Sequence, residues 1–332
     1  MQLRNDYLRE PYRQFKIILN PISGAGRGLR EGRALAQLLR QQGISVEVFI
    51  TQQSKDAEQE ASRTQIPIIV VGGDGTVNEV VNGLAGREIP VAVFPVGTAN
   101  ILAREFHLPG KPAAFLSLIQ SGRPRLLDTG QIQYDSGSLR KSSDQASLQT
   151  HHDSGCPQAQ RRFLMLASIG LDAEVTRVMR QIRSGSIHIH SYLMPLWHSL
   201  KKYHFHPFTL VIDDQIVATK VTTAVIGNTK NYGGFFSITH KALPDDGLLD
   251  ICTFPGQTVR DYLRYLTGAI LHRPTIFSDV AYYRGKKIEV FQTSSPIPIE
   301  LDGDFFGYTP FSCTIIPQSV PLLLPLIPSP QG

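Results

Sequence analysis

Up to about residue 125, short runs of β-branched and apolar residues alternate with longer segments whose apolar side chains recur at helical spacing. This alternation is typical of βαβ units, which build a mostly parallel sheet covered by helices. The apolar runs predict strands at residues 15–19, 45–50, 66–71 and 91–94. The helical spacing predicts helices at residues 29–42, 55–63, 77–85 and 112–121. We therefore expect a three-layer α/β domain at residues 14–128.

The pattern changes after this domain. Residues 134–162 are rich in Ser, Gln, Asp, Gly and His and contain almost no large apolar side chains, so a flexible insertion is expected there. Later apolar runs predict strands at residues 163–169, 208–212, 217–226, 249–254, 287–291, 297–301 and 311–316. Helical spacing recurs at residues 173–182, 192–203 and 258–271. Residues 129–318 are therefore expected to form a β-rich, sandwich-like second domain.

The end of the chain has two expected parts. Residues 319–325 are apolar enough for a strand that returns to the first domain, and residues 326–332 are expected to be a disordered tail. The apolar stretch at residues 320–327 is interrupted by two prolines and is far shorter than the roughly 20 residues that a spanning helix needs. Any membrane contact should therefore be peripheral.

Composition excludes several classes of protein. Of the 332 residues, 42% are hydrophobic and 18% are charged, which excludes collagen-like and coiled-coil chains. The net charge of +5 is too small for a dedicated nucleic-acid binder. The three cysteines lack the spacing of a zinc or redox site, and the first 16 residues lack the apolar run of a secretory signal. A reducing, cytoplasmic compartment fits these features.

The sharpest motif is a glycine-rich turn between a predicted strand and a predicted helix. It consists of Gly72, Gly73, Asp74, Gly75 and Thr76. Glycines let the backbone approach a phosphate chain closely, and the free N–H groups at a helix start favour anions. An acidic residue in such a turn would repel a nucleotide unless a cation lay between them, so Asp74 indicates Mg²⁺. The alternative is a tight turn with a capping Asp.

Two further turns follow predicted strands. The first contains Asn20, Ser23, Gly24 and Gly26, but it matches neither the Rossmann fingerprint nor the P-loop. The second contains Gly97, Thr98 and Asn100, whose hydroxyl and amide groups can contact phosphate or ribose. Ligands bind beyond the carboxyl ends of parallel strands, so the three turns are expected to form one nucleotide site.

The order of these turns resembles the catalytic domain of the diacylglycerol kinase family, which includes bacterial lipid kinases and sphingosine kinases. The resemblance continues through further segments of both domains, at residues 78–83, 102–105, 170–174, 227–228, 242–250 and 301–304. It covers roughly residues 16–325 without the insertion. NAD kinases and phosphofructokinases share only the Gly-Gly-Asp-Gly core. The resemblance implies an ATP site that also includes Glu79.

The resemblance also implies roles for residues of the second domain. Asp302 matches the family's general base, which takes the proton of the lipid hydroxyl, and Asp304 completes the catalytic pair. Asp246, with the carbonyl oxygens of Leu243 and Leu248, matches a structural Mg²⁺ site of bacterial members. On local sequence alone, Asp302 would be a turn residue before a glycine.

Two positions depart from the family pattern. Members often have Glu where this chain has Asp304, which is one methylene shorter. Many have Asp where this chain has Ile101, so one carboxylate that could lie near Mg²⁺ is missing. These departures keep open the alternative of a catalytically impaired regulator that binds nucleotide or lipid.

The leading hypothesis is an ATP- and Mg²⁺-dependent kinase that phosphorylates a membrane lipid, with diacylglycerol converted to phosphatidic acid. The alternative enzyme is a soluble kinase of NAD or of a sugar phosphate. Peripheral docking on a membrane is expected to use basic residues of the second domain, which are Arg177, Arg180, Arg183, Lys201 and Lys202. The His-rich segments are expected to be structural or exposed. The lipid, the role of the insertion and a homodimer stay open.

Overall fold

The computed structural model describes residues 12–133, 160–182, 203–233, 236–291 and 295–326. Its first part contains four parallel strands in the order β2-β1-β3-β4. They are β1 (Gln14–Leu19), β2 (Ser45–Ile50), β3 (Ile68–Gly72) and β4 (Val91–Pro95). All five residues of β3 are buried, because helices cover both faces of the sheet. The expected α/β domain is confirmed.

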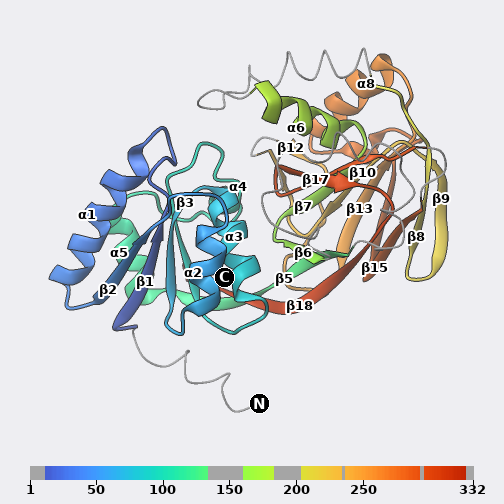
Figure 1. Ribbon diagram of the computed structural model, residues 1–332. Coiled ribbons are helices and arrows are strands. Elements are labelled where there is room, and N and C mark those ends of the chain that lie inside the picture. The colour runs from blue at the N-terminus through green and yellow to red at the C-terminus, as the bar shows by residue number, and fades with distance from the viewer. Residues whose placement is uncertain (1–11, 134–159, 183–202, 234–235, 292–294, 327–332) are drawn as a thin grey trace, which may run out of the picture.

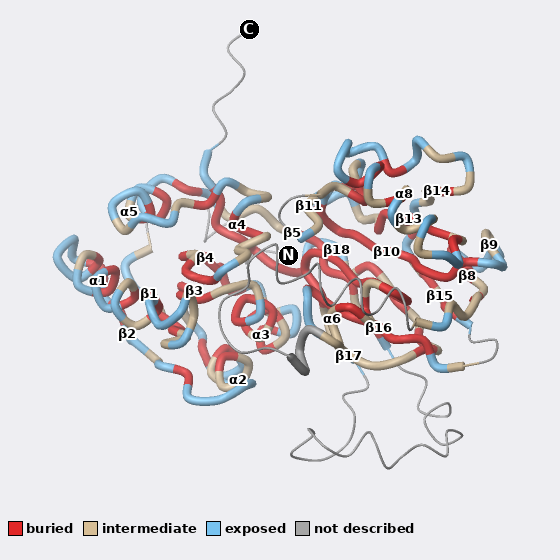
Figure 2. Tube along the Cα trace, turned by 90° about the horizontal axis from the view of Figure 1, so that it is seen from above, coloured by how far each residue is buried: buried red, intermediate tan, exposed pale blue. Residues whose placement is uncertain are grey.

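Five helices belong to this part of the chain (Figure 1). They are α1 (Arg27–Gln41), α2 (Asp56–Arg63), α3 (Asp74–Leu84), α4 (Ile101–Glu105) and α5 (Pro112–Ser121). The helices α1 and α5 pack together on one face of the sheet, and α2 and α3 pack together on the other (Figure 2). The helix α3 begins at Asp74, three residues before the predicted start, so the glycine-rich turn leads directly into the first helical turn.

One long strand joins the two halves of the molecule. The strand β18 (Phe311–Leu324) pairs parallel with β4 at Leu322 and antiparallel with β5 (Arg123–Gln133). Its last residues belong to the core of the α/β part, whereas Phe311, Cys313 and Ile315 belong to the core of the second part. The result is a continuous ten-stranded sheet that runs through both halves, with β18 at its centre.

The second part is rich in strands. The ten-stranded sheet continues beyond β18, and an antiparallel six-stranded sheet has the order β14-β13-β10-β7-β16-β17. The remaining strands of the large sheet are β6 (Gln160–Phe163), β8 (Phe208–Ile212), β9 (Gln215–Val221) and β15 (Lys287–Phe291). The six-stranded sheet consists of β7 (Leu166–Ile169), β10 (Thr223–Gly227), β13 (Leu249–Phe254), β14 (Ala281–Gly285), β16 (Pro298–Leu301) and β17 (Asp304–Tyr308). Apolar residues of both sheets form one core, which confirms a β-rich second domain.

The second part contains a few further elements among the described residues. They are α6 (Leu171–Ile182), α8 (Val259–Ile270), the 3₁₀ turn η3 (Pro274–Ile276), and the short strands β11 (Asn231–Tyr232) and β12 (Phe236–Ser237). Within these residues, no helix is long and apolar enough to cross a membrane. The predicted helix at residues 192–203 and the tail at 326–332 lie almost entirely outside the described residues, as do residues 134–159 of the expected insertion.

Two predicted strands are each divided in the structure. The run at 163–169 is split into β6 and β7, and the run at 217–226 is split into β9 and β10. In both cases the chain passes from one sheet to the other. At the second break, the buried Thr222 hydroxyl bonds to the carbonyl oxygens of Phe254 (3.0 Å) and Gly256 (2.6 Å). The apolar run alone does not show such a change of sheet, because the strand pattern is the same on both sides of each break.

Candidate active site

The three glycine-containing turns meet at one edge of the parallel sheet. They follow β1, β3 and β4, which are neighbours in the sheet and point in the same direction. The amide of Asn20 in the first turn donates a hydrogen bond to the Thr76 hydroxyl in the second (3.2 Å). A Cβ atom at Gly97 in the third turn would lie 2.5 Å from the Cα atom of Gly73. The turns therefore touch one another.

Two of these glycines are required by space or by backbone conformation. At Gly24, φ is +60°, and a Cβ atom there would lie 2.0 Å from the carbonyl oxygen of Val96. At Gly97, a side chain would push apart the second and third turns. Gly26 differs, because it is exposed, has φ of +86° and serves as the residue that precedes α1. Thr98 is exposed on the third turn, and Ser23 is half-buried in the first.

Asp74 holds the third turn against the second. Its carboxylate accepts hydrogen bonds from the backbone N–H groups of Ile101 (3.1 Å) and Leu102 (3.2 Å), at the start of α4. Burial raises the pKa of Asp74, and these backbone donors oppose the rise. Asp74 therefore caps the start of α4 and not α3, the helix in which it lies. Ile101, the departure from the family pattern, contributes its amide rather than a carboxylate.

The same turns offer oxygen atoms that suit a hard cation. Oδ1 of Asn100 is buried without a hydrogen-bond partner, while its Nδ2 donates to the carbonyl oxygen of Gly97 (2.9 Å). The backbone of Asn100 is itself hydrogen-bonded to the Asp74 carboxylate. Carboxylate and amide oxygens are ligands that Mg²⁺ accepts, so the residues present fit such an ion.

Asp302 and Gly303 form the two-residue turn between β16 and β17. Their φ values are +50° and +88°, and Leu301 pairs with Asp304 on either side of the turn. An Asp-Gly pair is the favoured sequence for a tight hairpin with two positive φ angles. The local sequence therefore explains the backbone at Asp302 before any chemistry is considered.

The Asp302 carboxylate is buried and accepts four hydrogen bonds. Oδ1 accepts from the amides of Met165 (2.9 Å) and Leu166 (3.1 Å). Oδ2 accepts from the amide of Leu164 (2.9 Å) and from Nδ2 of Asn78 (2.7 Å). The break between β6 and β7 thus supplies three backbone donors to this one side chain. Burial raises the pKa of Asp302, and all four donors oppose the rise.

Asp304 occupies a different environment. It is exposed at the start of β17. A Cβ atom at Gly75 would lie 3.7 Å from Oδ2 of Asp304, so this carboxylate faces the glycine-rich turn of the α/β part. The second domain therefore presents an accessible carboxylate directly to the turn that is expected to hold phosphate.

A polar junction that the sequence did not assign joins the two halves beside this site. Nδ2 of Asn78 donates to both Asp302 and the carbonyl oxygen of Arg162, and Oδ1 of Asn82 accepts from the Arg162 amide (2.9 Å). The Arg161 guanidinium donates to Oδ1 of Asn78 (2.9 Å). The two asparagines are four residues apart and lie on one face of α3. Their spacing in the sequence indicates a shared polar face on the helix, but it does not indicate which residues that face contacts.

Glu79 contacts the start of the neighbouring helix α2. Its carboxylate accepts hydrogen bonds from the backbone of Lys55 and Ala57, at the start of α2. Burial raises the pKa of Glu79, and these amides oppose the rise. Its visible role is to fix α2 against α3.

The expected structural Mg²⁺ site has other partners. The Asp246 carboxylate pairs with the Arg284 guanidinium and accepts the amide of Leu248 (3.1 Å). The same guanidinium lies 3.3 Å from the Asp250 carboxylate. A guanidinium thus neutralises the Asp246 carboxylate in this structure, and the Mg²⁺ site at Asp246, Leu243 and Leu248 stays a prediction. Within the described residues, no group of three or more His, Cys, Asp or Glu side chains is arranged to hold a metal ion.

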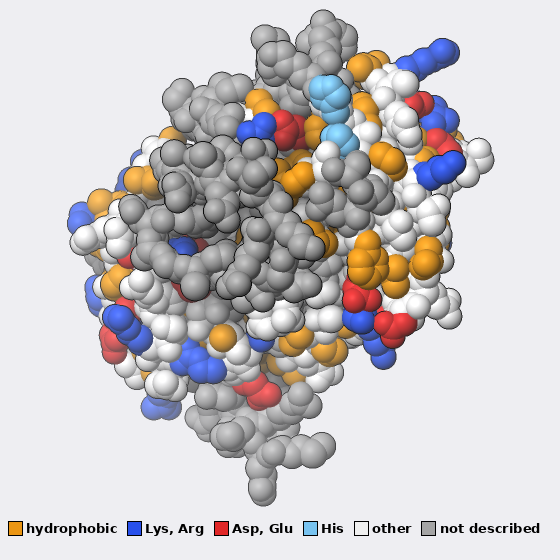
Figure 3. All heavy atoms as spheres, turned by 45° about the vertical axis from the view of Figure 1, so that its right-hand side comes forward, with side chains coloured by type: hydrophobic (Ala, Val, Ile, Leu, Met, Phe, Trp, Pro, Cys, Tyr) orange, Lys and Arg blue, Asp and Glu red, His pale blue; other side chains and the backbone are white. Residues whose placement is uncertain are grey.

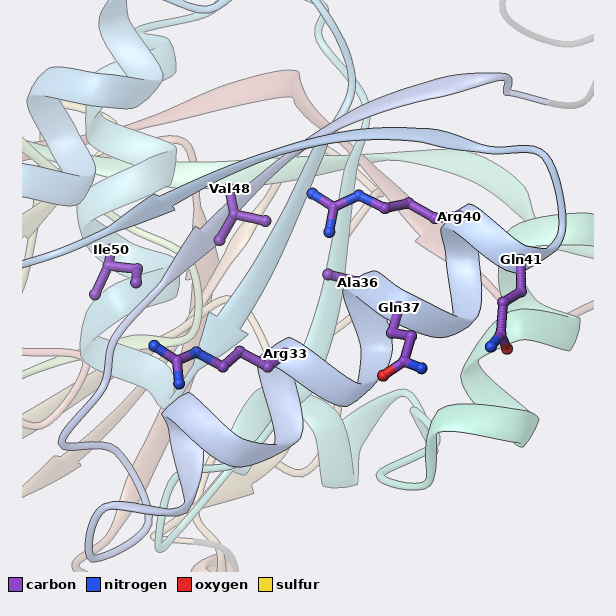
Figure 4. Close-up of a pocket in the computed structure, with 7 residues that line it drawn as sticks. All are labelled: Arg33, Ala36, Gln37, Arg40, Gln41, Val48 and Ile50. Atoms are coloured by element: carbon purple, nitrogen blue, oxygen red, sulfur yellow. The ribbon is translucent and has the colours of Figure 1, made fainter.

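A surface pocket lies elsewhere. It is formed by Arg33 and Arg40 of α1 with Val48 and Ile50 of β2, at the edge of the parallel sheet (Figure 4). None of the glycine-turn residues lines it. The convergence of the turns with Asp304 is therefore the better indicator of the active site.

The halves of the chain match known domain families. The "Diacylglycerol kinase catalytic domain" family model matches residues 14–132, and the "YegS C-terminal NAD kinase beta sandwich-like domain" model matches residues 166–324. The first part of the chain is thus similar to the diacylglycerol kinase catalytic domain, and the second part is similar to the YegS C-terminal domain. Members of this kinase family are phosphotransferases.

Relatives in the family have similar length. A "Diacylglycerol kinase" of Mycobacterium tuberculosis is 29% identical over 315 residues, covering 93% of this chain and 94% of the relative. A "Diacylglycerol kinase" of Staphylococcus carnosus is 23% identical over 322 residues, covering 93% and 94%. A crystal structure of a diacylglycerol kinase from Bacillus anthracis has a TM-score of 0.69 at 20% identity and covers 96% of this chain and 99% of that one. At this identity the structural likeness concerns the fold.

Proposed function

We propose that this protein is an ATP-dependent kinase that transfers the γ-phosphoryl group to a hydroxyl of a lipid, with diacylglycerol as the first acceptor to test. One observation carries the proposal: the exposed Asp304 carboxylate faces Gly75 of the glycine-rich turn. In this proposal, the Asp304 carboxylate is the proton acceptor, and the glycine-rich turn that it faces binds the phosphate chain. Two relatives are named diacylglycerol kinases, which supports diacylglycerol as the acceptor.

The nucleotide would be held by the three turns. Their glycines expose backbone N–H groups, and a phosphate chain can approach them without meeting side chains. Asp74 and the unpartnered Oδ1 of Asn100 are the residues that would hold Mg²⁺, directly or through water. The ion would supply charge neutralisation for the phosphate oxygens. Positioning and charge neutralisation provide most of the rate in phosphoryl transfer.

The carboxylates of Asp302 and Asp304 would have different roles in the reaction. An ionised carboxylate has about four acceptor positions, and four N–H donors already occupy those of Asp302. Asp304 is exposed, so it can receive the proton of the attacking hydroxyl. We therefore assign the general base to Asp304 and a positioning role to Asp302, which ties the hairpin to the break between β6 and β7. This revises the roles that the resemblance alone implies.

Contact with a membrane would bring the acceptor to the site. Of the basic residues expected to dock, Arg177 is paired with Glu174 (2.6 Å), and the side chains of the others lie outside the described residues. On the face shown in Figure 3, Lys and Arg side chains are scattered among acidic ones. At the end of α8, by contrast, Ile270 and Leu271 are 52% and 60% exposed. Peripheral contact is therefore proposed through this apolar helix end.

The test is transfer of labelled phosphate from ATP to diacylglycerol in mixed micelles with Mg²⁺. We expect labelled phosphatidic acid from the wild type and almost none from Asp304→Asn. The matched control is Glu289→Gln, which removes a carboxylate of β15 that pairs with Lys287. This variant should retain full transfer.

The alternatives are separated in the same assay. Labelling of NAD or of a sugar phosphate without detergent, and not of any lipid, would identify a soluble kinase. Tight binding of Mg²⁺-ATP with no labelled product on a panel of lipids would identify a regulator without catalysis. Either result would replace the proposed function.

A further inference from the structure

Two carboxyl groups of the second domain, one buried and one half-buried, are in contact with each other. Glu300 lies on β16 and is 3% exposed, and Asp172 lies in the first turn of α6. A side-chain hydrogen bond joins them. Two carboxylates cannot form such a bond while both are ionised, because neither then carries a hydrogen atom. The contact therefore requires one proton between the two groups.

The other groups that touch the pair are neutral hydroxyls. Oε1 of Glu300 accepts from Ser168 (3.1 Å) and Oε2 accepts from Thr176 (3.4 Å). Tyr232 of β11 is hydrogen-bonded to Asp172, whose Oδ2 is buried without a partner. Neither carboxyl forms an ion pair within the part of the chain that the structure describes. The surroundings thus provide no cation that would stabilise a second negative charge.

The charged groups facing the pair are mostly acidic. The hairpin that follows β16 carries Asp302 and Asp304, and both carboxylates act on Glu300. The helix α6 carries Glu174 and Arg177, which are ion-paired with each other. Burial raises the pKa of Glu300 well above its ordinary value, and the neighbouring carboxylates add to this rise. Burial raises the pKa of Asp172 as well.

We propose that Asp172 and Glu300 share one proton and form a positioning site, which fastens the catalytic hairpin to α6 and limits the negative charge beside the phosphoryl acceptor. The helix α6 packs on both β16 and β17, so the pair lies at the joint between them. Loss of the shared proton would add a second negative charge to the pair, next to Asp302 and Asp304, where a triphosphate must approach. The part of the inference that concerns catalysis rests on the proposed function, whereas the shared proton does not.

The sign of the pH dependence follows from the raised pKa. An acid that is neutral in the folded state but ionised in the unfolded state contributes stability below its unfolded pKa, and this contribution is lost as pH rises through the folded pKa. Wild-type stability should therefore decline from the ordinary Glu pKa of 4.5 towards alkaline pH. Glutamine at 300 cannot ionise and can still donate a hydrogen bond to Asp172.

The experiment compares the wild type with Glu300→Gln, and uses Glu289→Gln as the control on a different strand. Urea unfolding of the full chain at several pH values between 5 and 9 measures the slope of stability. Glu300→Gln is expected to flatten the decline, and the control is expected to keep it. A decline that is the same in Glu300→Gln and in the wild type would overturn the shared proton, whether or not the protein is a kinase.

Kinase activity supplies a second measurement. In Glu300→Gln, the alkaline limb of the kcat/KM profile should move to higher pH, because this pair can no longer gain a second negative charge. If Glu300→Gln flattens the pH dependence of stability but leaves the pH profile of kcat/KM unchanged, only the positioning role is overturned. If Glu300→Gln does not fold, Asp172→Asn tests the same pair, because its amide can donate the hydrogen bond to Glu300 without a shared proton. A pH slope of stability in Asp172→Asn equal to that of the wild type would overturn the pair.

Discussion

Asparagine at positions 302 and 304 should have opposite effects on stability and catalysis. In Asp302→Asn, the amide oxygen can keep the bonds to the amides of Met165 and Leu166. The new NH₂ group then faces two donors, the Leu164 amide and Nδ2 of Asn78, which were 2.9 and 2.7 Å from Oδ2. Two hydrogen bonds to a charged acceptor are lost, and donors are turned towards donors.

The cost can be estimated from these contacts. Hydrogen bonds to charged groups contribute about 1.5–3 kcal/mol each, so the loss of two costs about 3–6 kcal/mol. For a chain of 332 residues, this corresponds to a fall in Tm of about 4–8 °C. Asp304 is exposed and should behave differently: Asp304→Asn is expected to change stability by less than about 0.5 kcal/mol. Loss of a general base should lower kcat by about 10²–10⁴-fold.

Thermal unfolding and the labelled-phosphate assay measure the two effects separately. Asp304→Glu is the matched control, because it keeps the carboxylate and adds one methylene, and we expect it to remain active. An Asp302→Asn protein that melts at the wild-type temperature would refute the hydrogen-bond argument. An Asp304→Asn protein with wild-type kcat would remove Asp304 from the role of base.

Three further predictions concern the turns, the membrane and the metal. Gly24→Ala should weaken ATP binding, because the new Cβ atom would meet the carbonyl oxygen of Val96. Gly43→Ala is the control, since Gly43 also has a positive φ but open space around it, and it should affect stability only. Equal ATP affinities of the two variants would disprove the steric argument. Leu271→Glu should reduce sedimentation with anionic lipid vesicles without lowering Tm, and unchanged sedimentation would exclude this helix end. Because Arg284 neutralises Asp246, EDTA should leave the wild-type Tm unchanged, and a fall would show a structural cation.

The local sequence was sufficient to predict most of the helices and strands and the glycine-rich turns of the candidate site. The apolar periods predicted the strands of the parallel sheet, and glycines after three of them predicted where the turns meet. The Asp-Gly pair at 302 and 303 specified a tight hairpin. These features depend on residues within a few positions of one another, so a single sequence contains the required information.

Tertiary structure decided what each polar side chain does. The donors that surround Asp302 come from residues 164–166 and from α3, and the arginine that neutralises Asp246 lies 38 positions away. Glu79 caps α2, a contact that its sequence motif did not indicate, and Asp172 meets Glu300 across 128 positions of sequence. The backbone conformation is set locally, whereas the lone pairs of a carboxylate are filled by whichever donors packing brings to them. The same residue type can therefore bind a ligand, cap a helix or share a proton, and only the folded chain distinguishes these roles.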